Sequence, residues 1–285
     1  MEDVKRVEFL EGVAREIRVS IINMLLGAKS GHTAGPLGMA DIFAVLYFEI
    51  MKHNPKDPTW KDRDLFVLSN GHIAPVLYAT LAHAGYLEVD ELLTLRKFGS
   101  RLQGHPHREY LPGVETSSGP LGSGLSQAIG MALADRIDNG RNSNKQIFCF
   151  MGDGELNEGQ CWEAIMHAGK ERLQNLCLVI DRNNIQIDGF TEDIMPLEPL
   201  ADKFKAFNFH VLEINGHDIA DIIRGFKTAA SVFEKPTVII AHTIPGKGVK
   251  EFERDFKWHG VTPNKEQAQT ALRELLSLGG QIKID

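Results

Sequence analysis

The chain has 285 residues and a formal net charge of −7, and its hydrophobic fraction of 43% can supply the core of one large domain. No basic block points to nucleic acid, no apolar run is long enough to span a membrane, and the charged start does not resemble a signal peptide. Three cysteines without Cys-x-x-Cys spacing indicate reduced thiols, so we expect a cytoplasmic protein. We expect a single domain over residues 1–285.

The first half of the chain is predicted to be mostly helical. Apolar residues at helical spacing predict a helix over 4–27, and a Gly-rich loop over 30–38 separates it from an apolar helix over 39–51. A short strand is expected over 65–68, with the polar segment Ser69-Asn70-Gly71-His72 at its carboxyl end. Further helices are expected over 73–84, 88–98 and 122–139.

The second half contains a predicted strand–helix–strand unit. Its strands are the apolar runs 147–151 and 176–180, and the helix between them begins near Glu158. After a loop that extends to Pro199, two more strands and a last helix are expected over 209–214, 237–241 and 265–278. Apolar runs that alternate with helical segments favour an α/β fold, a parallel sheet with helices on both faces.

The most informative residues stand at the ends of the two strands of this unit. Gly152-Asp153-Gly154 follows the first strand, and Asn183-Asn184 follows the second. Ligands of open α/β sheets bind at the carboxyl ends of the strands, so Asp153 and Asn183 should face one another across a crevice. A carboxylate and an amide oxygen are hard ligands that suit Mg²⁺. A carboxylate repels phosphate unless a cation lies between them, so the pair suggests a metal-bridged diphosphate.

Other interpretations of the same residues stay open at this point. Gly152 and Gly154 begin a Gly-x-Gly-x-x-Gly pattern in which Asp181 would hold the ribose of a nicotinamide cofactor, but position 157 is Asn. Either half of the motif alone would fit an ordinary glycine turn with a capping Asp, or a polar loop. No phosphate-binding P-loop motif occurs, and the histidines lack the His-x-x-x-His spacing of a zinc site.

The Gly-Asp-Gly turn and the Asn-Asn pair, at this spacing, are similar to the thiamine diphosphate motif, and the longer match is to the transketolase family. Five further segments resemble that family in its order and extend the resemblance from about residue 10 to 265: Lys29-Ser30-Gly31-His32, Ser69-Asn70-Gly71-His72, Gln103-Gly104-His105-Pro106, Gly119-Pro120-Leu121-Gly122 and Lys257-Trp258-His259-Gly260. The resemblance implies the thiamine diphosphate-binding domain of such an enzyme.

The resemblance also implies a set of cofactor ligands. Asp153, Asn183 and the backbone carbonyl of Ile185 match the Mg²⁺ ligands of the family, with diphosphate oxygens and a water completing an octahedron. Gly154 would let the backbone approach the phosphates, and the helix that begins near Glu158 would point its amino end at them. The expected cofactor-binding residues are Gly119, Pro120, Leu121, Gly152, Asp153, Gly154, Glu158, Asn183 and Ile185.

Four histidines and one glutamate are the expected catalytic residues. By resemblance, His32, His72, His105 and His259 surround the substrate channel, where imidazoles can donate to sugar hydroxyls and carry protons. Glu158 is either an ordinary acid that complements a helix dipole, or the acid that reaches the activating Glu of a neighbouring domain, and the second interpretation is preferred.

Two positions depart from the family pattern. Ser123 stands where the family more often has Gln, and Thr33 stands where Pro is common. Neither departure touches a predicted metal ligand, so only the side-chain roles at these two positions are in doubt.

A complete transketolase is more than twice this length and carries a second, pyrimidine-binding domain. We therefore expect the N-terminal subunit of a split transketolase of the pentose phosphate pathway, which forms a heterotetramer with a C-terminal partner chain and is inactive without it. With thiamine diphosphate and Mg²⁺, such an enzyme transfers a two-carbon ketol unit between sugar phosphates. The alternatives are a related split enzyme with another sugar, a deoxyxylulose-phosphate synthase, or a non-catalytic binding or regulatory remnant of the domain.

Overall fold

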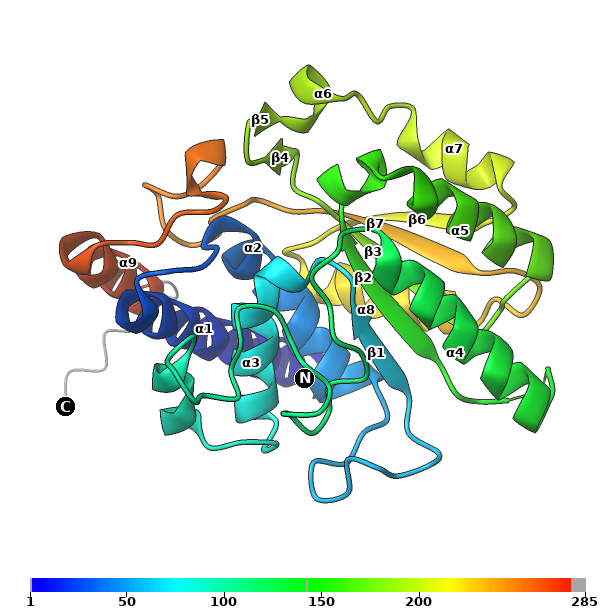
Figure 1. Ribbon diagram of the computed structural model, residues 1–285, viewed down its shortest axis with the longest axis horizontal. Coiled ribbons are helices and arrows are strands. Elements are labelled where there is room, and N and C mark those ends of the chain that lie inside the picture. The colour runs from blue at the N-terminus through cyan, green and yellow to red at the C-terminus, as the bar shows by residue number, and fades with distance from the viewer. Residues whose placement is uncertain (1, 142, 278–285) are drawn as a thin grey trace.

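Five parallel strands form the central sheet of the computed structural model, which describes residues 2–141 and 143–277 (Figure 1). They lie in the order β1, β2, β3, β7, β6, and each strand runs parallel to its neighbours. Their bounds are Leu65–Leu68 (β1), Ile147–Gly152 (β2), Leu176–Arg182 (β3), His210–Asn215 (β6) and Thr237–His242 (β7). All five predicted strands are thus present, and the predicted α/β fold class is confirmed.

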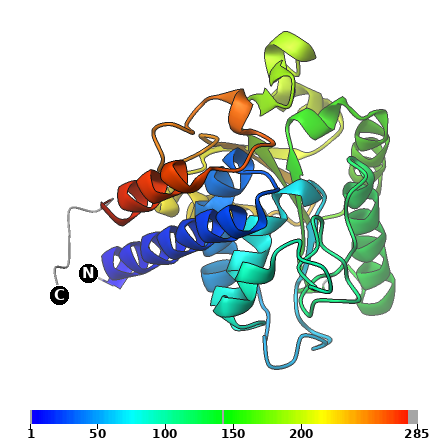
Figure 2. The ribbon, with the colours of Figure 1, turned by 60° about the vertical axis from the view of Figure 1, so that its left-hand side comes forward.

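Helices cover both faces of this sheet (Figures 1 and 2). One face carries α1 (Glu2–Ala28), α2 (Ala34–Val45), α3 (Ala74–His83), α8 (Ile219–Ala230) and α9 (Lys265–Ser277). The other face carries α4 (Ser123–Asn139), α5 (Gly159–Glu171) and α7 (Leu200–Ala206). Short 3-10 turns lie at Gly71–Ile73, Val89–Thr94, Gly154–Asn157 and Phe256–Trp258, and a π turn lies at Leu46–Ile50.

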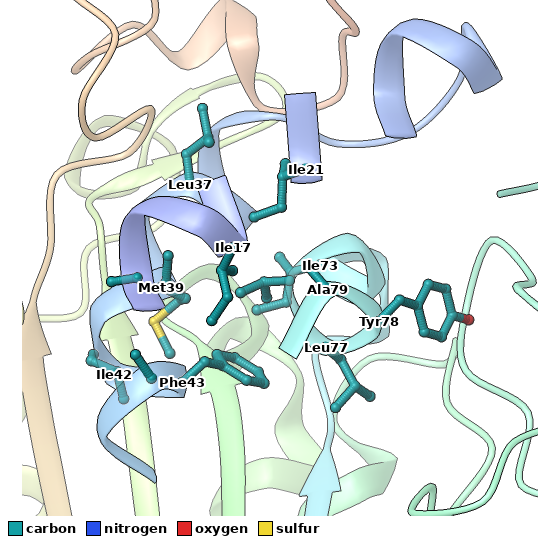
Figure 3. Close-up of a cluster of buried hydrophobic side chains, with 14 of the residues drawn as sticks. Ile17, Ile21, Leu37, Met39, Ile42, Phe43, Ile73, Leu77, Tyr78 and Ala79 are labelled. Carbon is teal, nitrogen blue, oxygen red and sulfur yellow. The ribbon is translucent and has the colours of Figure 1, made fainter. Parts of the chain in front are cut away.

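The core explains why a central strand such as β2 is a continuous apolar run. Phe148 and Phe150 of β2 point into the cluster beneath α1, α2 and α3, whereas Cys149 and Met151 point into the cluster beneath α4 and α5. Successive strand residues alternate between faces, so both sets must be apolar when both faces are covered. Figure 3 shows the first cluster, in which side chains of α1, α2 and α3 such as Phe43 meet.

Two predicted helices in the first half differ clearly from the structure, those over 39–51 and 88–98. Helix α2 begins at Ala34, inside the predicted loop over 30–38, because Pro36 is tolerated in a first helical turn. The predicted helix over 39–51 is α-helical only as far as Val45 and then continues as the π turn. Over 88–98 only the short 3-10 turn forms, because Arg96 has a φ of 57° that a right-handed helix cannot contain.

The segment after β3 holds regular structure where the sequence predicts a loop. A small hairpin, β4 (Ile185–Gln186) and β5 (Gly189–Phe190), leads into the single turn α6 (Thr191–Ile194). Helices α7 and α8 were also not predicted. Helix α8 has a recognisable start, because the Asp218 side chain accepts from the Asp221 amide at 3.1 Å. The last predicted helix is confirmed up to Ser277, and its predicted final residue lies outside the described residues.

Within the described ranges, the structure contains no helix that combines the length and the apolar character needed to cross a membrane.

The topology gathers polar strand ends at one edge of the sheet. Gly152 of β2 is in register with Asp181 of β3, so Asp153 and Asn183 follow neighbouring strands. Helices α4 and α5 both begin at this edge, and β4, β5 and α6 project beyond it (Figure 1). A ligand at this edge would therefore meet strand ends and the amino ends of helices together.

Candidate functional site

A cavity of about 350 Å³ lies at the carboxyl ends of β1, β2 and β3. All but two of the predicted site residues line it: His32, His72, His105, Gly119, Leu121, Gly152, Asp153, Gly154, Asn183, Ile185 and His259. The two that do not are Pro120, which is exposed, and Glu158, which is exposed at the start of α5. The structure thus brings together segments from residue 32 to residue 259.

Asp153 is almost fully buried, with only 1% of its surface exposed. Its Oδ1 accepts from the Gly154 amide at 2.7 Å, and its Oδ2 accepts from the Asn184 amide at 2.8 Å. Arg182 Nη1 donates to the same Oδ2 at 3.0 Å. Burial raises the pKa of Asp153, and the bonds from Asn184 and Arg182 oppose that rise.

The amide of Asn183 is oriented by a second carboxylate. Asn183 Nδ2 donates to Asp181 Oδ2 at 2.7 Å, and Asn183 Oδ1 accepts from the Ile185 amide at 3.0 Å. Thr243 Oγ1 donates to Asp181 Oδ1 at 2.5 Å, while burial raises the pKa of Asp181 to about 7. These bonds fix which end of the Asn183 amide is the oxygen, the atom that a hard cation would use.

The residues of the cavity fit a metal-bridged diphosphate. Oxygen donors from Asp153, Asn183 and Ile185 border one space, and in the described part of the chain no set of three His, Cys, Asp or Glu side chains could hold a metal unaided. Asn70 Oδ1 and Gln186 Oε1 are buried there without a hydrogen-bond partner, which indicates space for a polar ligand. A Cβ at position 154 would approach Gln186 Oε1 to 3.1 Å, so glycine keeps the wall open.

Three of the predicted histidines form a close cluster. The ring centroids of His32 and His72 are 4.8 Å apart, and those of His32 and His259 are 5.6 Å apart. Burial lowers the pKa of His32 to about 4 and that of His72 well below its usual value. The pKa of His259 is lowered by burial as well. The cluster is therefore uncharged at neutral pH, and the Nδ1 atoms of His32 and His259 have no partner.

His105 lies beside this cluster, next to Gly119, and Arg96 supplies a positive charge close to it. Arg96 Nη1 donates to Ser30 Oγ at 2.8 Å. Burial and the charge of Arg96 lower the pKa of His105, and Arg96 also contributes to the low pKa of His32. Sequence reasoning missed Arg96, because its segment was assigned to a regular helix.

The two departures from the family pattern make structural hydrogen bonds. Thr33 is fully buried, and its Oγ1 donates to the Val261 carbonyl at 2.5 Å, which ties the loop of His32 to the segment of His259. Ser123 is the first residue of α4, and its Oγ donates to the Pro120 carbonyl at 2.8 Å.

Glu155 is a buried carboxylate that the sequence analysis did not single out. It accepts from Ser69 Oγ at 2.5 Å, from the Gly122 amide at 2.6 Å and from the Gly152 amide at 3.3 Å. It therefore joins the end of β1, the glycine loop before α4 and the turn after β2. The cavity-lining residues that were missed are Asn70, Glu155, Asn157, Gln186, Ile187 and Asp188, and Asp181 had been considered only for a ribose.

The parallel sheet, the glycine turn and the oxygen donors at adjacent strand ends define an α/β domain that binds the diphosphate of a cofactor. Residues 11–281 match the family described as "Transketolase, thiamine diphosphate binding domain". The chain belongs to the transketolase family. The nicotinamide alternative is thereby removed.

Two relatives have nearly the same length as this chain. The first, from Phocaeicola vulgatus, is named as a subunit of apulose-4-phosphate transketolase and is 41% identical over 95% of both chains. The second, from a Clostridium species, is named as a subunit of 6-deoxy-6-sulfo-D-fructose transketolase and is 42% identical over 86% of this chain and 88% of its own. Neither relative is named as a whole transketolase.

The fold is also that of solved transketolases. The structure from Campylobacter jejuni superposes with a TM-score of 0.89 at 38% identity, over 94% of this chain and 43% of that one. The chain thus spans less than half the length of that transketolase.

Proposed function

We propose that this chain is the N-terminal, diphosphate-binding subunit of a split transketolase. The assembly would transfer a two-carbon ketol unit from a ketose phosphate to an aldose phosphate, with thiamine diphosphate and Mg²⁺. The observation that carries the proposal is that one cavity is lined by the Asp153 carboxylate, the Asn183 amide and a cluster of uncharged histidine side chains. Relatives of similar length that are named transketolase subunits support it.

The cofactor would be held mainly through its diphosphate. Asp153, Asn183 and the Ile185 carbonyl would bind Mg²⁺. Because Gly154 and Gly119 have no side chains, they would leave space for the phosphates. When bound, thiamine diphosphate supplies the carbanion that cleaves and forms the carbon–carbon bond.

The imidazoles would handle the hydroxyl groups of the sugar. Because burial lowers the pKa values of His32, His72 and His259, each ring keeps one nitrogen free to accept a proton at neutral pH. The unpartnered Nδ1 atoms of His32 and His259 are candidates to meet substrate hydroxyls. Arg96 adds a fixed positive charge beside His105 that suits an oxygen-rich substrate.

The rest of the active site would come from a C-terminal partner subunit with the pyrimidine-binding domain and the activating Glu. Glu158 is exposed at the start of α5, where it could reach that Glu. Two copies of each subunit would form a heterotetramer, and the chain alone would be inactive. Three buried free cysteines suit a reducing compartment, and we place the assembly in the cytoplasm.

A second candidate is the same transfer with another sugar. The two relatives of similar length carry different sugars in their names, although both are about equally similar to this chain. The groups that bind the sugar phosphate would belong to the partner, so the ketose that donates the two-carbon unit must be established by assay.

The test is to capture the partner from the native lysate on the tagged chain, with Mg²⁺ and thiamine diphosphate present, and then to co-express the pair. Ketol transfer from xylulose 5-phosphate by the pair, and not by either chain alone, is the expected result. Transfer only from other ketose phosphates would favour the second candidate. A pair that binds no thiamine diphosphate would contradict the proposal, and a pair that binds it without any transfer would favour a non-catalytic role. An Asp153→Ala pair is the matched inactive control.

A further inference from the structure

Arg182 is a buried cation for which the proposed reaction has no use. It is the last residue of β3, directly before Asn183, and only 3% of its side chain is exposed. A buried guanidinium must be paired, because its desolvation is costly. Its partners therefore define what it does.

Three carboxylates from two segments surround Arg182. Nη1 bonds to Asp153 Oδ2 at 3.0 Å, and Nη2 bonds to Glu192 Oε1 at 2.6 Å and to Glu198 Oε1 at 2.9 Å. Asp153 is buried, whereas the side chains of Glu192 and Glu198 are 38% and 58% exposed. Arg182 thus links a predicted metal ligand to the segment 191–199, which follows the β4–β5 hairpin at the open edge of the sheet (Figure 1).

The charges of this group are unbalanced. One guanidinium faces three carboxylates, so the group keeps an excess of two negative charges, the charge that one divalent cation would neutralise. Without that cation, Arg182 is the group that offsets the charge of Asp153. Other buried polar bonds to Asp153 come from the backbone amides of Gly154 and Asn184.

The hydrogen bonds of Asp153 leave one acceptor position for a metal while Arg182 stays bound. Asp153 Oδ2 accepts two N–H groups, from Arg182 and Asn184, which fills its two lone pairs. Asp153 Oδ1 accepts only from Gly154, so one lone pair of Oδ1 is left for a cation. A metal at Oδ1 and a guanidinium at Oδ2 are therefore compatible.

We propose that Arg182 is a positioning residue that acts as a built-in counter-cation. It holds Asp153 and the segment 191–199 in their binding arrangement before Mg²⁺ arrives, and the metal then binds at Oδ1 without displacing it. The inference rests on the proposed function for the identity of the metal. The pairing of Arg182 itself does not depend on that function.

Hydrogen exchange of the full chain in EDTA tests the first half of this proposal. The amide of Asn184 donates to Asp153, that of Leu197 to Glu192 and that of Leu200 to Glu198, and Arg182 holds all three carboxylates. Arg182→Met is therefore expected to speed hydrogen exchange of these three amides by at least about ten-fold. Arg182→Lys keeps the charge and is expected to change exchange by less than about three-fold. The matched control is Arg136→Met, which removes another paired arginine, bonded to Glu171. Its effect should be confined to α4 and α5.

Metal dependence in the co-expressed pair tests the second half. In the wild type, Mg²⁺ with thiamine diphosphate should change exchange over 183–199 by less than about three-fold, because Arg182 already holds the segment. In Arg182→Met the same addition should slow exchange by at least about ten-fold, because the metal then supplies the missing charge. A role limited to packing would not make exchange depend on the metal in this way.

The inference is overturned if Arg182→Met exchanges like the wild type in EDTA, or if Arg182→Lys behaves like Arg182→Met. If Arg182→Met does not fold, the double variant Glu192→Gln, Glu198→Gln replaces it. That variant should release the segment 191–199 while the Asn184 amide, bonded to Asp153, stays protected. A wild-type pair that binds no thiamine diphosphate would refute the proposed function instead, and the exchange comparison in EDTA would still decide the role of Arg182.

Discussion

Asp153 combines a negative charge with a fixed orientation, and both are needed for a metal ligand. We expect Asp153→Ala to weaken the Mg²⁺-dependent binding of thiamine diphosphate by at least about 100-fold, the equivalent of roughly 3 kcal/mol. Calorimetric titration of the pair measures this loss, and circular dichroism checks that the fold is retained. Asp188→Ala removes an exposed carboxylate from the rim of the same cavity and should change the affinity by less than about three-fold. Equal losses for the two variants would remove Asp153 from the ligand set.

The histidine cluster makes folding stability depend on pH. Burial lowers the pKa of His32 to about 4 in the folded chain, against an ordinary value of 6.5. Between these values the unfolded chain binds more protons, so lowering the pH from 6.5 towards 4 destabilises the fold, while above 6.5 this contribution vanishes. We expect His32→Asn to flatten the fall of the thermal midpoint between pH 7 and pH 5. An equally steep fall in His32→Asn would contradict the assignment.

Among single residues, the sequence predicted those that belong to a motif and missed those whose hydrogen-bond partners are distant in the chain. Asp153 and Asn183 were found because strand ends of a parallel sheet share one edge. Glu155 and Arg182 carry no such signal, since their partners lie in other segments and nothing nearby in the sequence marks either side chain as buried. Roles for the histidines stay predictions, although the structure places them together.

Helix packing can be tested with two glycines in neighbouring helices. A Cβ at Gly169 of α5 would collide with the backbone of Phe207, whereas a Cβ at Gly130 of α4 meets nothing within 4 Å. We expect Gly169→Ala to destabilise the chain by about 1–3 kcal/mol through overpacking. Gly130→Ala should stabilise it by about 0.5–1 kcal/mol, because alanine favours the helix. Urea unfolding of both variants gives the comparison, and a stabilising Gly169→Ala would mean that α5 is not packed tightly against the turn after α7.

The glycine loop before α4 depends on Glu155. Glu155→Ala would leave the Gly122 amide and the Ser69 hydroxyl without an acceptor, and each stranded buried donor costs about 1–3 kcal/mol. We therefore expect a loss of at least about 2 kcal/mol in the free energy of unfolding, together with weaker binding of thiamine diphosphate. Glu163→Ala, on the exposed side of α5, is the control and should cost less than about 0.5 kcal/mol. A loss no larger than in that control would mean that Glu155 does not hold the three loops together.

Element prediction succeeded where the periodicity was strong and failed where short-range geometry decides. All five sheet strands were found, and four of them contain continuous apolar runs, whereas β6 is interrupted by Glu213. The hairpin β4–β5 and the single turn α6 contain too few residues for any periodic pattern. Helix α8 could have been predicted, since Asp218 is a good N-cap and Ile219, Ile222 and Phe226 repeat at helical spacing.

At the scale of the whole molecule, the carboxyl ends of the parallel strands explain how one chain can form the diphosphate-binding part of the proposed active site. We call this part the diphosphate half-site. The strand ends, the glycine turn and the starts of α4 and α5 all belong to this chain. In our proposal the partner supplies the pyrimidine-binding domain, the activating Glu and the groups that bind the sugar phosphate. The fold class followed from alternating apolar and helical segments. The identity of the sugar could not be predicted, because in our proposal the groups that bind the sugar phosphate belong to the partner subunit.

Binding at this half-site should stabilise the isolated chain, because all three predicted metal ligands belong to it. At a concentration 100 times its Kd, a ligand that binds only the folded state adds about 2.7 kcal/mol of stability. We expect thiamine diphosphate with Mg²⁺ to raise the thermal midpoint by several degrees, and EDTA to abolish the rise, because without a cation the buried Asp153 carboxylate repels the diphosphate. Asp153→Ala should show no rise under any of these conditions. A rise of the same size in EDTA would mean that the diphosphate binds without a bridging metal, and the proposed ligand set of Asp153, Asn183 and Ile185 would have to be abandoned.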